Sequence, residues 1–152
     1  MIGREIVFHP WRWLAWGWIK RWVRKSFPTV ETISTATLAT RLLEDSPPLL
    51  LDVRKAEEYA VSCLPGAIHA PNLAAVSTIA TLDTPLVLYC SVGYRSARLA
   101  ELLQQHGYRN VVNLEGSIFQ WRNEGRSLET HSQSTRQVHP YNRLWGLLLE
   151  PL

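Results

Sequence analysis

Cysteine is scarce in this chain of 152 residues, which contains only Cys63 and Cys90. One pair is too few for the disulfide framework of a small secreted domain, and no signal-peptide pattern precedes it. We therefore expect a reducing compartment, with the cytoplasm as the default location. The five histidines have no metal-ligand spacing, so the sequence predicts no metal site.

Long hydrophobic runs are also absent. No apolar run reaches about 18 residues, so we expect no transmembrane helix. The net charge of +3 is unevenly distributed, because residues 1–28 contain six basic residues and one acidic residue, a net of +5. The other residues carry a net charge of −2. The basic excess therefore belongs to an N-terminal arm, and we expect no nucleic acid as a partner.

The chain divides by composition into three parts. Residues 1–28 form the arm, residues 29–128 form one domain, and residues 129–152 form a polar linker (129–137) followed by an apolar tail. In the domain, short apolar runs alternate with helical patterns. We expect strands at 49–51, 67–69, 86–89 and 111–114, and helices at 36–44, 55–61, 73–80, 95–106 and after Gly116. This alternation predicts an α/β sandwich with a mostly parallel sheet.

The arm contains five of the seven tryptophans. A helical arrangement places Trp11, Leu14, Ala15, Trp18, Ile19 and Trp22 on one face, with Lys20, Arg21 and Arg24 on the other side. One interpretation is an interfacial helix on an anionic membrane surface, which would make the protein peripheral at a membrane. The alternative is an arm that packs on the domain or on another subunit, or that stays disordered. The apolar tail would pack with the arm or add a second contact.

The segment Cys90-Ser91-Val92-Gly93-Tyr94-Arg95-Ser96 lies between a predicted buried strand and a predicted helix. Ligands of parallel sheets bind beyond the carboxyl ends of the strands, and the first amides of a helix attract anions. These amides would stabilise the thiolate form of Cys90. Gly93 permits a positive φ, which turns successive amides toward one centre, and Arg95 adds a fixed charge. An isolated cysteine is more often a small buried hydrophobe, but this order of residues favours a nucleophile.

The loop resembles the active-site loop of the rhodanese family, Cys-x-x-Gly-x-Arg-Ser. The resemblance covers residues 30–128 and extends to further segments in the same order: Leu51-Asp52-Val53-Arg54, Glu58-Tyr59, Leu64-Pro65-Gly66-Ala67-Ile68, and Leu114-Glu115-Gly116 followed by Trp121. It implies a three-layer α/β sandwich, with a mostly parallel five-stranded sheet flanked by helices.

The resemblance also implies a reaction. Cys90 would take a sulfane sulfur from thiosulfate or a persulfide, become a persulfide itself, and pass the sulfur to a thiol or cyanide. Residues 91–96 would form the anion-binding loop, in which Arg95 would help to bind an anionic donor. Asp52, Arg54 and Glu58 would support the loop, with Arg54 pairing with Glu58. No metal or organic cofactor would be required.

Alternatives and departures from the family pattern accompany this prediction. Related phosphatases and arsenate reductases have five residues between Cys and Arg, whereas four stand here, which favours sulfur over phosphate. A membrane-associated binding or scaffold module with little turnover is the other alternative. In thiosulfate-using members, the loop position that Ser91 occupies here often has a basic residue. We therefore expect a persulfide or polysulfide to be the better donor. Cys63 stands where the family usually has His, and it could instead resolve an oxidised Cys90.

Overall fold

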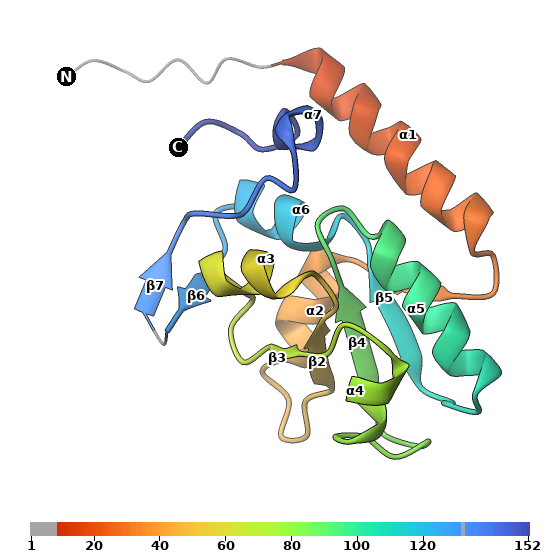
Figure 1. The fold of residues 1–152 in the computed structure, drawn as a ribbon. Coiled ribbons are helices and arrows are strands. Elements are labelled where there is room, and N and C mark those ends of the chain that lie inside the picture. Colours follow the sequence, from red (N-terminus) through yellow and green to blue (C-terminus); the bar gives the residue numbers. More distant parts are fainter. Residues whose placement is uncertain (1–8, 132) are drawn as a thin grey trace.

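The computed structural model describes residues 9–131 and 133–152, so residues 1–8 of the predicted arm and residue 132 of the predicted linker lie outside it. A five-stranded sheet forms its centre, with all neighbouring strands parallel (Figure 1). The strand order is β1-β5-β4-β2-β3. The strands are β1 (Glu31–Ile33), β2 (Leu49–Asp52), β3 (Ile68–His69), β4 (Leu86–Tyr89) and β5 (Val111–Leu114).

The apolar runs of the sequence become the central strands. Every residue of β4 and β5 is buried, as are three of the four residues of β2. Val87 lies opposite Leu50 on one side and Val112 on the other. Continuous apolar runs suit parallel strands because helices cover both faces of such a sheet. The predicted α/β class, with a five-stranded parallel sheet flanked by helices, is confirmed.

The connections locate the point where a ligand would bind. The chain passes from β1 through α2 (Thr35–Arg41) to β2, and through α3 (Ala56–Val61) to β3, moving in one direction across the sheet. It returns through α4 (Leu73–Ser77) to β4, and through α5 (Tyr94–Gln105) to β5, in the opposite direction. Because such crossovers are right-handed, α2 and α3 cover one face of the sheet, and α4 and α5 cover the other. The connections leaving β2 and β4 therefore diverge, which opens a crevice at the carboxyl ends of these strands.

Helix α1 (Pro10–Ser26) runs along the outside of α5 (Figure 1). Ile19 and Val23 are its buried residues, whereas Leu14 and Trp18 point outward. The packed face is therefore rotated from the face that the sequence predicted. Apolar residues occupy most of the circumference of this helix, so periodicity alone does not select the stripe that packs. Among the helices described, none has the length and apolarity that crossing a membrane would require.

The C-terminal segment contains more structure than the predicted linker. After α6 (Ser117–Asn123), strands β6 (Leu128–Thr130) and β7 (Gln133–Thr135) form a small antiparallel sheet. The Leu128 side chain is buried in the core and anchors this small sheet. Strand β7 is mostly exposed, which agrees with its polar sequence. The tail then contains α7 (Arg143–Gly146), and Leu148 is buried. The Asn123 side chain donates a hydrogen bond to the Leu148 carbonyl, so the tail is fixed on α6.

Candidate functional site

Cys90 follows the last residue of β4 directly, at the crevice where the connections diverge. Its exposed fraction is 1 %, so a reactant reaches its sulfur only through a pocket. The amide of Gly93 donates a hydrogen bond to Cys90 Sγ over 3.2 Å. Gly93 has φ 110°, a conformation that side chains disfavour, although a Cβ there would meet only ordinary contacts. Backbone conformation, rather than lack of space, therefore requires glycine at this turn.

Ser96 contacts the sulfur from the first turn of α5. Its Oγ lies 3.4 Å from Cys90 Sγ and 2.6 Å from Asn113 Oδ1. A hydroxyl has one proton, and the Asn113 amide nitrogen already donates to the Gly93 carbonyl, so Oδ1 is an acceptor. The Ser96 hydroxyl therefore donates its proton to Asn113 Oδ1, the closer of the two atoms. A neutral Cys90 thiol can then donate to Ser96, whereas a thiolate would draw the serine proton toward itself.

The backbone of the loop is clamped by α6. The amides of Ile118 and Phe119 donate to the carbonyls of Cys90 and Ser91. The Ser117 hydroxyl accepts from the Cys90 amide over 3.2 Å and donates to the Leu114 carbonyl over 2.9 Å. The sequence did not identify Asn113 or Ser117 as site residues. These contacts fix the backbone of the loop against the start of α6.

Arg95 forms an ion pair with Glu58, with two nitrogen–oxygen distances of 2.8 Å. It also donates to Ser91 Oγ over 2.9 Å. Burial would raise the pKa of Glu58, but the hydrogen bonds from Arg95 and from the Lys55 amide lower it to about 2. Burial would lower the pKa of Arg95, but Glu58 and the nearby Cys90 raise it overall. Both groups are therefore charged at neutral pH.

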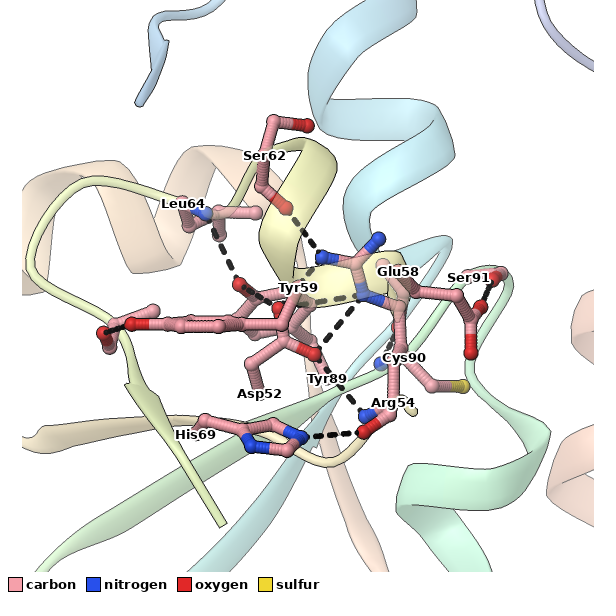
Figure 2. A network of polar contacts seen from close by, with 12 residues as sticks. Asp52, Arg54, Glu58, Tyr59, Ser62, Leu64, His69, Tyr89, Cys90 and Ser91 are labelled. Atoms are coloured by element: carbon pink, nitrogen blue, oxygen red, sulfur yellow. Dashed lines mark hydrogen bonds and ion pairs between the residues drawn. The ribbon is translucent and has the colours of Figure 1, made fainter. Parts of the chain in front are cut away.

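The predicted pairing of Arg54 with Glu58 is wrong. Arg54 instead pairs with Asp52, over 2.6 Å, and donates to the Ser62 carbonyl (Figure 2). The Tyr89 hydroxyl donates to the same carboxylate over 2.6 Å. Asp52 is the last residue of β2 and Arg54 follows two residues later, whereas Glu58 on α3 binds Arg95 of the Cys90 loop. This buried network joins the end of β2 to Tyr89, the residue before Cys90.

A pocket with an empty volume of about 440 Å³, its open mouth included, leads to Cys90. Of the predicted loop, Cys90, Ser91, Val92, Tyr94 and Arg95 line it, while Gly93 and Ser96 lie behind them. Asp52, Arg54 and Glu58 do not line it. Three aromatic residues that the sequence did not assign to the site complete the walls: Trp22, Tyr141 and Trp145.

Cys63 lies apart from this pocket, with its backbone paired to Glu129 of β6. Burial, Asp52 and Glu129 raise the pKa of its thiol, which disfavours the reactive thiolate. In residues 9–131 and 133–152, no group of three His, Cys, Asp or Glu side chains could hold a metal ion. The arrangement therefore presents one pocket-facing sulfur, beside a helix N-terminus and a paired arginine.

Comparison with known proteins identifies the family of this site. The family model described as "Rhodanese-like domain" matches residues 35–124, more than half of the chain. A sulfurtransferase of Allochromatium vinosum is 33% identical over 98 residues, which cover 63% of this chain and 92% of that protein. The thiosulfate sulfurtransferase GlpE of Actinobacillus succinogenes is 32% identical over 98 residues, which cover 63% and 88%.

Solved structures agree at the level of the fold. A rhodanese-like domain protein of Staphylococcus aureus is 32% identical, with a TM-score of 0.59, over 68% of this chain and all of that chain. A polysulfide-sulfur transferase homodimer of Wolinella succinogenes has the same TM-score, 20% identity, and coverage of 77% and 90%. At that identity, it shows only a similar fold. Trp22, Tyr141 and Trp145 lie outside the residues that the family model matches.

Proposed function

Because the chain belongs to the rhodanese-like domain family, and its relatives are sulfurtransferases, we propose that it moves a sulfane sulfur through a persulfide on Cys90. The observation that carries the proposal is the position of Cys90. Its sulfur accepts a hydrogen bond from the Gly93 amide and lines the pocket at the N-terminus of α5. A thiolate there is a suitable nucleophile, because the amide and the helix dipole stabilise its negative charge.

The transfer has two steps that share this pocket. The Cys90 thiolate attacks the outer sulfur of the donor, a new S–S bond forms, and the old bond breaks with its electron pair on the departing thiolate or sulfite. The acceptor, a thiol or cyanide, then attacks the outer sulfur of the Cys90 persulfide, and Cys90 leaves as a thiolate. The loop amides stabilise the anionic sulfur in both steps, as an oxyanion hole does.

The charges in the loop favour a persulfide or polysulfide donor over thiosulfate. Arg95 is the one charged side chain among the described residues that line the pocket, and Glu58 holds it from the other side. Ser91, at a position that is often basic in thiosulfate-using members, adds no charge. A thiosulfate dianion would therefore meet a cation that is already neutralised by a carboxylate.

Steady-state kinetics with a varied donor and cyanide as acceptor test the proposal. A persulfide intermediate predicts ping-pong behaviour, which gives parallel lines in double-reciprocal plots, and loss of turnover in Cys90→Ser. Hydrolysis of p-nitrophenyl phosphate serves as the control for phosphatase chemistry. Phosphate release without sulfur transfer would refute the proposal.

We further propose that the outer face of α1 binds an anionic lipid surface. Leu14, Trp18, Arg21 and Lys25 are spaced as one helical stripe, and all four are exposed. Arg12 donates a hydrogen bond to the Leu147 carbonyl, which brings the exposed tail leucines, Leu144 and Leu147, beside the same helix. An apolar stripe that continues into basic residues suits an interface with anionic headgroups. Since a free thiolate requires a reducing compartment, this surface would face the cytoplasm.

Co-sedimentation with phosphatidylglycerol vesicles tests this surface. The double variant Arg21→Glu with Lys25→Glu should lose binding, because it reverses the charge of the stripe. The pair Arg109→Glu with Arg136→Glu reverses as many exposed charges elsewhere and should retain it. Equal binding by both variants would contradict the proposal. Vesicle binding by a protein without sulfur turnover would instead favour the scaffold alternative.

A further inference from the structure

We infer that the two terminal segments give the pocket its specificity, and that its substrate is an organic thiol or persulfide whose carbon part is apolar or aromatic. This inference rests on the proposed sulfur transfer and adds the chemical class of the reactant. The observation behind it is the origin of the pocket walls. Trp22 comes from α1, whereas Tyr141 and Trp145 come from the tail beyond residue 135.

The aromatic walls are held in place on both sides. Trp22 stacks on Tyr94 of the loop, with ring centroids 4.4 Å apart, and Phe27 meets the same ring edge-on at 5.0 Å. The Asn142 side chain accepts a hydrogen bond from the Trp145 amide over 2.9 Å, which caps α7 at its start. The ring of Trp22 and the backbone that carries Trp145 are therefore held before a substrate arrives, which favours affinity.

The tail is also fixed to the domain and to α1. Asn123 binds the Leu148 carbonyl and the Glu150 amide, and the Ser62 hydroxyl donates to the Gln137 carbonyl over 2.6 Å. Arg12 of α1 donates to the Leu147 carbonyl over 3.0 Å, so the two terminal segments contact each other. These contacts turn two segments that are far apart in the sequence into one wall of the pocket.

The charge in the pocket argues against a small anion as the preferred substrate. The Arg95 guanidinium is paired with Glu58, and its carbon lies 4.7 Å from the centre of the Tyr141 ring. Tyr141 has φ 65°, in the left-handed region, so the backbone adopts a disfavoured conformation where the ring covers Arg95. A pocket lined mainly by aromatic side chains, with one arginine that is already paired, suits a small apolar or aromatic group better than a small anion.

The chemistry balances without an oxidant or a reductant. With a donor R–S–SH, the Cys90 thiolate gains the outer sulfur, and R–S⁻ leaves with the electron pair of the broken S–S bond. In the second half, a thiolate R′–S⁻ takes that sulfur from the Cys90 persulfide, and Cys90 leaves as a thiolate. The group R or R′ would occupy the space between Trp22, Tyr141 and Trp145.

The experiment measures sulfur transfer from the Cys90 persulfide of the full chain to two acceptors. The acceptors are 2-phenylethanethiol, which is aromatic, and 2-mercaptoethanesulfonate, which is anionic. We expect a higher kcat/KM for the aromatic thiol, and we expect Trp145→Ala to reduce this preference about tenfold, mainly through KM. Trp13→Ala removes the same side chain from an exposed position and should retain the preference. Trp145→Phe should restore most of it, and thermal unfolding of each variant shows whether it is folded.

Equal kcat/KM for the two thiols, or equal effects of Trp145→Ala and Trp13→Ala, would overturn the inference. A second measurement separates it from the proposed function. Binding of 2-phenylethanol, which cannot accept sulfur, is followed by tryptophan fluorescence in the Cys90→Ser protein. If Cys90 carries no sulfur, the proposed function fails. In that case, binding that Trp145→Ala weakens would still support the apolar pocket, and absence of binding would refute it.

Discussion

Both terminal nitrogens of Arg95 bind the carboxylate of Glu58, each over 2.8 Å, and this pair connects the Cys90 loop to α3. Glu58 is buried, and Arg95 is the charged side chain that faces the pocket. The pair therefore has two consequences. It fixes the start of α5, and it reduces the net positive charge that an incoming sulfur donor meets.

Glu58→Gln should lower the free energy of unfolding by about 1.5–3 kcal/mol, the range for hydrogen bonds to charged groups. Urea denaturation measures this difference. Glu57→Gln is the matched control, since Glu57 precedes Glu58 on α3 and is exposed. It should change stability by less than about 0.5 kcal/mol. Equal losses in the two variants would show that the pair with Arg95 contributes nothing to stability.

Acid should weaken the same pair within a defined range of pH. The pKa of Glu58 is lowered from 4.5 to about 2, so its ionised form stabilises the folded state. That contribution is complete above pH 4.5 and disappears as the pH falls toward 2. The stability difference between the wild type and Glu58→Gln should therefore be constant at higher pH and shrink across this range. A difference that persists unchanged at pH 2 would contradict the assignment.

Glu58→Gln should also change the choice of donor. Without the carboxylate, Arg95 carries an unbalanced positive charge at the pocket, so kcat/KM for thiosulfate should rise relative to that for a persulfide. The ratio of the two values, measured with cyanide as acceptor, is insensitive to a general loss of activity. An unchanged or lower ratio would show that the pair does not control the use of anionic donors.

Asp52→Asn should cost about 3–5 kcal/mol of unfolding free energy, because it leaves the buried charge of Arg54 unpaired. Burial would lower the pKa of Arg54, but the hydrogen bond and the charge of Asp52 raise it, so this arginine is charged in the fold. Asp83→Asn removes the carboxylate of an exposed pair with Arg109 and should cost less than about 1 kcal/mol. Similar values for the two variants in urea would contradict the network's role.

Cys63 should behave as an unreactive thiol at neutral pH. Burial and the charges of Asp52 and Glu129 raise its pKa, so little thiolate is present. In the Cys90→Ser variant, alkylation by iodoacetamide should be slow at pH 7 and accelerate in alkaline solution, as followed by intact mass. Cys63→Ser should retain sulfur transfer. A disulfide between the two cysteines after mild peroxide treatment would instead support a resolving role for Cys63.

The central strands and the edge strand β3 were predictable from the sequence, but the other edge strand, β1, was not. The runs at β2, β4 and β5 are continuous and apolar because both faces of these strands are covered. Strand β1 has three residues, of which only Ile33 is buried, and it exists because it pairs with β5. The hairpin of β6 and β7 is mostly polar because it lies at the surface, so it has no apolar run either.

The candidate loop was also predictable, whereas its partners were not. The seven residues from Cys90 are contiguous, so their order alone indicates an anion-binding turn. Glu58 and Arg95 are 37 residues apart, and the sequence predicted Arg54, which is nearer in the chain, as the partner of Glu58. Trp22 and Trp145 meet at the pocket only because both termini fold back over α5 and α6. Sequence periodicity contains no information about such distant contacts.

Intact mass spectrometry of the protein after incubation with a persulfide donor tests the central claim most directly. The account predicts a gain of one sulfur atom that cyanide removes and that Cys90→Ala abolishes, while Cys63→Ser retains it. A protein that gains no sulfur from a persulfide, a polysulfide or thiosulfate, or that gains it equally in Cys90→Ala, would contradict the account.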